Sequence, residues 1–117
     1  MNCRGHPMNK FDLIYFFKAL SENEQLSFIC RLAHLLTVSA RATYLHDSDG
    51  VSDPQILRWL NEAQHYLLGQ ACNLAEGNSQ RYSDEVFCEG LVLRAEHPMY
   101  GKIFTKALNQ VVVQMNG

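Results

Sequence analysis

The stretch SENEQLSFICRLAHLLTVSARATY, residues 21–44, decides the fold class of this chain. It begins with Ser21 and Glu24, the spacing of a capping box in which each side chain accepts a hydrogen bond from the other residue's backbone N–H. The apolar side chains that follow share one broad face of a helix at 100° per residue. They are Leu26, Ile29, Cys30, Ala33, Leu36, Ala40 and Tyr44, with Phe28, Leu32 and Leu35 widening the face. Because only a narrow polar stripe remains, we expect a central helix that other helices cover on most sides.

Four more helical segments are expected, at about residues 9–20, 54–76 and 84–96 and from Pro98 onward. Their boundary signals are Asn9, Ser52-Asp53-Pro54, Gly77 and Ser83, which are typical of helix caps, starts and stops. The expected core stripe of the 54–76 segment is Ile56, Leu57, Leu60, Ala63, Leu67, Leu68, Ala71 and Leu74. The β-branched run 111–113 leaves an extended chain end as an alternative. Since short connections favour antiparallel neighbours, the sequence predicts an all-α, four- or five-helix bundle, mostly antiparallel with short loops.

Length and composition predict one domain and exclude several classes of protein. The 117 residues form a single helical domain over 9–117 in this interpretation, preceded by a flexible tail over 1–8. Apolar residues make up 47% of the chain and charged residues 19%, which excludes disorder as the default state. The net charge of −2 argues against a protein that binds nucleic acid or an acidic membrane surface.

The cysteine pattern predicts a cytoplasmic protein. The four cysteines are Cys3, Cys30, Cys72 and Cys88, widely spaced and without a Cys-x-x-Cys pair. A small secreted scaffold would be denser in cysteine, so we expect buried or half-buried free thiols in a reducing compartment. No apolar run approaches the length of a membrane-spanning helix, and the N-terminus does not resemble a signal peptide.

The charge distribution is uneven along the chain. Residues 47–97 hold three arginines against nine Asp and Glu, a local balance of −6. Glu85, Glu89 and Glu96 fall on one side of the predicted 84–96 helix. A solvated face explains such a cluster, and an acidic surface for a basic protein partner is the sharper hypothesis.

Glu62 and His65 suggest one enzymatic alternative. Their Glu-x-x-His spacing is the one by which helical bundles supply ligands to a di-iron or di-manganese centre. The chain has no second pair of this kind, and both residues point away from the apolar stripe of their helix. Arg58, one turn before Glu62, is a ready ion-pair partner. We therefore expect no metal or cofactor, with a metal-dependent helical-bundle enzyme that uses Glu62, His65 and His34 as the rival hypothesis.

Aromatic residues in excess of the helical stripes provide the remaining functional signal. They are Phe11, Phe16, Phe17, Trp59 and Tyr66. Lining a broad core is the plainer role for them, and an interface is the functional one, because aromatic residues are enriched at interfaces. No catalytic residues are predicted. The sequence favours a small soluble, non-enzymatic binding or self-association module, such as an adaptor, inhibitor, antitoxin-like or immunity-like protein, that forms a homodimer.

Overall fold

The computed structural model describes residues 9–46 and 54–116 of the chain, and over these residues it contains five helices and no strand. The helices are α1 (Lys10–Lys18), α2 (Glu22–His46), α3 (Pro54–Ala75), α4 (Asp84–Ala95) and α5 (Gly101–Asn116). The prediction of an all-α helical bundle is confirmed. The expected tail over 1–8 lies outside the described residues, as do Ser52 and Asp53.

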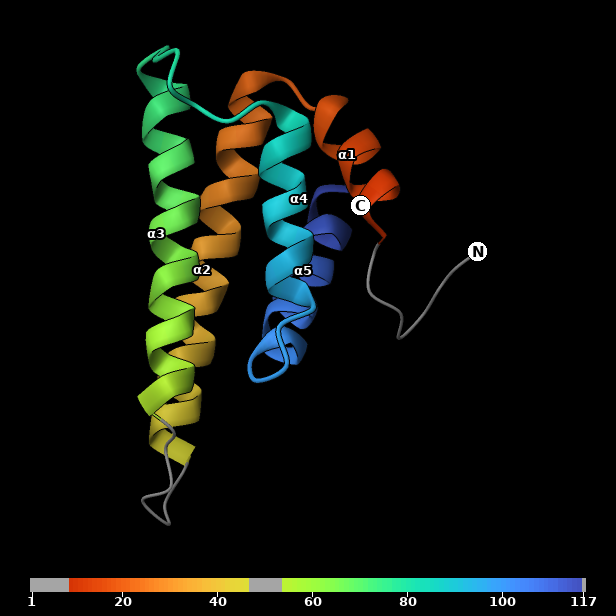
Figure 1. The fold of residues 1–117 in the computed structure, drawn as a ribbon. Helices are drawn as coiled ribbons and strands as arrows, with labels where there is room; N and C mark the ends of the chain where they lie inside the picture. Colours follow the sequence, from red (N-terminus) through yellow and green to blue (C-terminus); the bar gives the residue numbers. More distant parts are fainter. Residues whose placement is uncertain (1–8, 47–53, 117) are drawn as a thin grey trace.

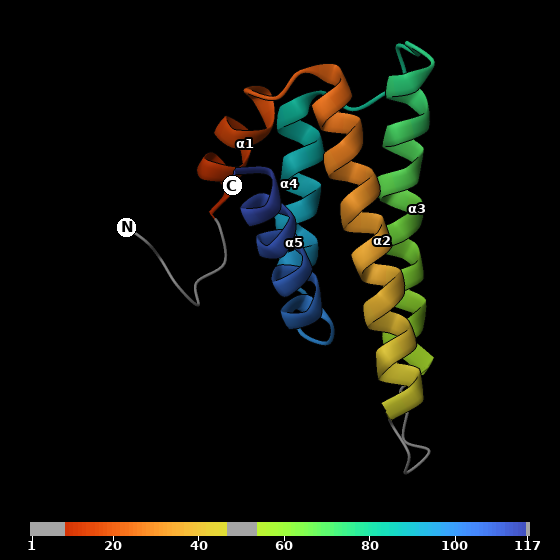
Figure 2. The ribbon, with the colours of Figure 1, turned by 180° about the vertical axis from the view of Figure 1, so that it is seen from behind.

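The bundle is built around a long antiparallel pair of helices, α2 and α3 (Figure 1). This pair extends beyond α4 and α5 at one end, and α5 packs against α2 and α4 (Figure 2). Helix α1 packs against α4 near the opposite end. Four helices thus form the bundle, and the short α1 covers one of its edges.

The helix boundaries follow local signals in the sequence. The Ser21 N–H donates to Glu24 Oε1 at 2.8 Å and the Glu24 N–H to Ser21 Oγ at 3.2 Å, so the capping box forms. Asn9 and Ser83 cap α1 and α4 through their side-chain oxygens. Gly77 ends α3 with a φ of 66°, a conformation that favours glycine. Residues 111–113 are helical, so the extended alternative was wrong.

A chain of phenylalanine rings joins α1 to the rest of the core. Phe17 is buried, with its ring centroid 5.5 Å from that of Phe28 on α2 and 5.3 Å from that of Phe87 on α4. The buried Gln25 side chain donates to the Phe17 carbonyl at 3.0 Å, which holds the end of α1 in place. These contacts fix α1 against both α2 and α4.

Two side chains of the expected apolar stripes are exposed among those whose burial is described, which leaves out Ala40 and Tyr44. Cys30 on α2 and Leu68 on α3 both face solvent, although the helical wheel placed them with the core residues. A wheel gives the direction of a side chain but not which neighbour lies there. The buried stripe is therefore narrower than predicted on both helices.

Candidate functional site

The five aromatic residues predicted as an interface do not share one surface. Phe17 is 1% exposed and belongs to the core, and Phe16 is half-buried against Phe28. Phe11 is 75% exposed on the outer side of α1. Trp59 and Tyr66 are half-buried, and each is engaged with other rings of its own chain. Of the five, Phe11 has the most surface to offer a partner.

Trp59 packs against the connection between α4 and α5. Its ring centroid lies 4.7 Å from that of His97 and 6.5 Å from that of Tyr100. His97 Nδ1 accepts the backbone N–H of Met99 at 3.1 Å, just before α5 begins. Trp59 therefore stabilises a connection inside the molecule.

Tyr66 is the centre of a second cluster, between α3 and α4. Its ring stacks on Phe87 with centroids 5.4 Å apart and 9° between the planes, and its hydroxyl donates to the Phe87 carbonyl at 3.0 Å. The Arg94 guanidinium lies 3.8 Å from the Tyr66 ring centroid. Burial raises the pKa of Tyr66 to about 12. The cluster holds α3 and α4 together.

The residues of the metal-enzyme hypothesis do not converge. Both carboxylate oxygens of Glu62 accept hydrogen bonds from Arg94, at 3.1 and 2.5 Å, so its ion-pair partner is on α4 and is not Arg58. His65 and His34 are exposed on α3 and α2. Within the described ranges, no three His, Cys, Asp or Glu side chains are grouped so that they could hold a metal ion.

Cys88 on α4 is a buried thiol whose reactive, deprotonated form is disfavoured. Its side chain is fully buried, and its Sγ lies 3.9 Å from the Leu13 carbonyl oxygen. Burial, with Asp84 and Glu85 nearby, raises the pKa of Cys88 to about 12. Cys30 and Cys72 are exposed free thiols, so the prediction of burial was wrong for these two, and Cys3 lies outside the described residues.

Thiol labelling tests this difference in burial. At pH 8, we expect iodoacetamide to modify Cys30 and Cys72 in the folded protein and to leave Cys88 unmodified. A pKa of about 12 makes the thiolate about 1,000-fold rarer than in an ordinary thiol. Peptide mass spectrometry after timed labelling measures each site, with labelling in denaturant as the control. Equal rates at Cys88 and Cys30 would contradict the burial of Cys88 under α1.

Four large apolar side chains of α1 and α4 are exposed outside the core: Phe11, Tyr15, Val86 and Leu93. We call the surface that carries them the α1/α4 face. Phe11 and Tyr15 lie one turn apart on α1 and are 75% and 82% exposed. Val86 and Leu93 lie two turns apart on α4 and are 48% and 68% exposed. Of these four residues, only Phe11 was predicted from the sequence. The helical spacing of the other three was visible in the sequence, but the packing of α1 on α4 was not.

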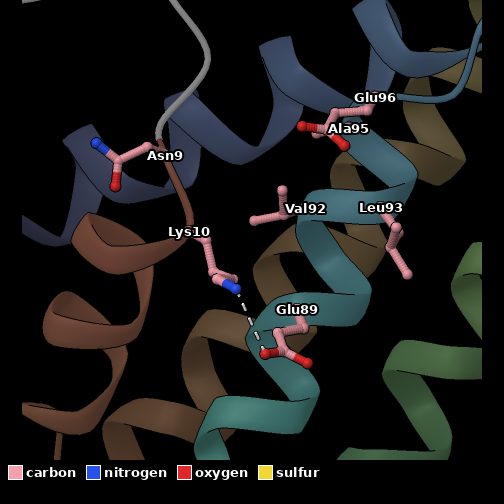
Figure 3. A pocket seen from close by; sticks show the side chains of 7 residues that line it. All are labelled: Asn9, Lys10, Glu89, Val92, Leu93, Ala95 and Glu96. Carbon is pink, nitrogen blue, oxygen red and sulfur yellow. Dashed lines mark ion pairs between the residues drawn. The ribbon is translucent and has the colours of Figure 1, made fainter.

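A groove of about 550 Å³ lies between the start of α1 and the second half of α4 (Figure 3). Its lining residues are Asn9, Lys10, Glu89, Val92, Leu93, Ala95 and Glu96. The Lys10 ammonium lies 3.6 Å from Glu89 Oε2 across the groove and 5.3 Å from the Phe11 ring centroid. The groove therefore joins charged and apolar parts of the α1/α4 face.

The predicted acidic cluster borders the same groove. Lys18 Nζ donates to Glu85 Oε2 at 2.7 Å, and this hydrogen bond holds the pKa of Glu85 below its usual value. Glu89 pairs with Lys10, so two of the three glutamates face lysines of α1. Glu96 is exposed, and no cation of the described chain forms an ion pair with it. The acidic row of α4 thus lies beside a basic row on α1.

Comparison with known proteins adds no relative. Among the described helices, none combines the length and apolarity needed to cross a membrane. No family model matches the chain, and neither a curated protein nor a solved structure is detectably similar to it. What the protein does must therefore be inferred from its own surface.

Proposed function

We propose that this protein is a non-enzymatic interaction module that binds a protein chain through the α1/α4 face. One observation carries the proposal. Of the nine large apolar side chains exposed in the described part of the chain, four lie on this face: Phe11, Tyr15, Val86 and Leu93. Apolar side chains gathered on one side of a small domain, rather than scattered singly, are typical of a binding surface.

The composition of the face supports a protein as the ligand. Leu93 lines the groove together with Lys10, Glu89 and Glu96, and the Lys10 ammonium lies over the exposed Phe11 ring. Protein interfaces have this combination of an apolar centre with aromatic residues and a polar rim. An adaptor, an inhibitor or an antitoxin-like or immunity-like protein would use such a face.

The proposal includes a cytoplasmic location. Cys30 and Cys72 are exposed free thiols in the structure. An exposed thiol persists where the glutathione and thioredoxin systems keep it reduced, whereas an oxidising compartment exposes it to disulfide exchange. Both cysteines therefore fit a reducing compartment better than an extracellular one.

Site-specific photocrosslinking tests the proposed face. p-Benzoylphenylalanine would replace Leu93 on the face in one variant and Val113 on α5 in another, in the cells that make the protein. Both positions are 68% exposed, so they are matched in accessibility. We expect a crosslinked protein adduct of defined mass at position 93, at several times the yield found at position 113, measured by immunoblot and mass spectrometry.

Two results would contradict the proposed function. Equal yields at positions 93 and 113 would mean that the α1/α4 face has no preference for a partner. If a variant with a native circular dichroism spectrum gave no adduct at position 93, the α1/α4 face would not be a binding surface. A third variant, Phe11→p-benzoylphenylalanine, replaces one aromatic residue with another and repeats the test on the α1 side of the face.

A further inference from the structure

We infer that the protein covering the α1/α4 face is a second copy of this chain, placed so that α1 of each subunit lies on α4 of the other. This inference rests on the proposed function and names its partner. It follows from how opposite charges are distributed over the two helices of the face.

The two helices of the face carry charges of opposite sign. Helix α1 presents Lys10 and Lys18, whose side chains are 42% and 52% exposed. Helix α4 presents Glu85 and Glu89, each 51% exposed, and Glu96 beyond them. Because an exposed ion pair contributes little to stability, exchanging its partner for the same residue of a second chain costs little. The face is therefore complementary to itself.

The helices run in opposite directions, which fixes the register. Lys10 pairs with Glu89 and Lys18 with Glu85, so α1 ascends while α4 descends (Figure 1). Consider a two-fold axis that runs above the groove, parallel to both helices. This axis leaves each residue at the same position along the helix direction and places α1 of one subunit over α4 of the other. Lys10 then meets Glu89 of the partner subunit, and Lys18 meets Glu85 of the partner subunit. The intrachain pairing thus gives the register of the intermolecular pairing.

The alternative two-fold arrangement is electrostatically unfavourable. An axis across the helices would lay α4 on the partner's α4 and place glutamates opposite glutamates. Like charges facing each other across an interface suppress that orientation, while opposite charges favour the first. In the favoured arrangement, Phe11 and Tyr15 pack over the side of α4 in the partner subunit that carries Val86 and Leu93. The apolar and charged contacts therefore select the same dimer.

Reversing the charges of one row at a time tests the arrangement. One variant carries Lys10→Glu with Lys18→Glu, and the other carries Glu85→Lys with Glu89→Lys. Each variant alone places like charges in both contacts of the dimer, whereas a one-to-one mixture forms a heterodimer with opposite charges in both. Lys102→Glu with Lys106→Glu reverses two exposed lysines of α5 and is the matched control.

Sedimentation equilibrium at low ionic strength, from 5 to about 200 μM protein, measures the association. We expect the wild type and the α5 control to dimerise alike, and each reversed variant to have a Kd roughly 30-fold higher. We expect the mixture to return to within about threefold of the wild-type Kd. If a reversed variant lacks a native circular dichroism spectrum, Phe11→Lys mixed with Leu93→Glu repeats the test with two exposed positions.

Three outcomes would overturn the inference, and each is distinct from failure of the proposed function. A mixture that remains monomeric while the wild type dimerises would exclude the α1-on-α4 arrangement. If the Kd of the α5 control rose as much as that of the reversed variants, the effect would come from the net charge of the protein and not from the α1/α4 face. A wild type that is monomeric throughout would exclude a second copy as the partner. In that case, an adduct at position 93 that is heavier than a dimer or lighter than one would still support binding of a different protein.

Discussion

Phe87→Ala is expected to lower the free energy of unfolding by about 3–5 kcal/mol, the usual range for truncating a buried phenylalanine. Phe87 is fully buried on α4, and its ring contacts Phe17 of α1 and Tyr66 of α3. Its removal leaves a cavity where three helices meet, and the stacked Tyr66 ring loses the surface on which it lies. Urea denaturation followed by circular dichroism measures the change.

An exposed apolar residue away from the α1/α4 face provides the control for this prediction. Val113→Ala on α5 removes apolar atoms from a side chain that is 68% exposed, so we expect a change within about 0.5 kcal/mol. A loss below about 1 kcal/mol for Phe87→Ala would contradict the packing of α1 and α3 on α4. Because Phe17 depends on the same ring contact, α1 should also lose protection from hydrogen exchange in this variant.

Gly90→Ala is expected to lower the free energy of unfolding by about 2–3 kcal/mol, although alanine is the better helix former. A Cβ atom at Gly90 would lie 2.0 Å from Tyr66 Oη and 2.5 Å from Tyr66 Cζ. The ring would have to move, which breaks its hydrogen bond to the Phe87 carbonyl and separates it from Arg94. Thermal and urea denaturation both report the loss.

A double-mutant cycle isolates the cause. Tyr66→Leu removes the ring that the new Cβ would meet, so we expect Gly90→Ala to cost about 2 kcal/mol less in that background. Gly69→Ala is the control, because no atom lies within 4 Å of a Cβ at this helical glycine. It should stabilise the protein by up to about 1 kcal/mol. An increase in stability for Gly90→Ala comparable to that for Gly69→Ala would contradict the close approach of the Tyr66 side chain to Gly90.

The helices themselves were predictable because their signals are local. Ser21 with Glu24, Asn9 and Ser83 act on backbone groups three residues away, and those contacts form as the sequence implies. Residues 111–113 are the exception. Their β-branched side chains are compatible with an extended end, but Val111 and Val112 are buried in the bundle, and this packing outweighs the small helix penalty of valine.

The candidate site was only partly predictable because it combines two helices distant in the sequence. Phe11 and the glutamates of α4 were identified, while Tyr15 and Leu93 were not. Phe17 shares the aromatic character of Phe11, but the rings of Phe28 and Phe87 surround it in the core. Periodicity gives each residue an angle on its own helix, whereas exposure depends on which neighbour occupies that angle.

Five helices and the caps of α1, α2 and α4 follow from the sequence alone, because capping and the 3.6-residue period act over single turns. What each helix surface faces depends on the packing of the helices against one another. This packing pairs Glu62 with Arg94 across two helices, places Lys10 and Lys18 against Glu89 and Glu85, and leaves Phe11 and Leu93 in solvent. These outcomes depend on how rigid helices with fixed faces pack around one core, and the contacts join residues that are 32 positions apart for Glu62 and Arg94 and 67 for Lys18 and Glu85.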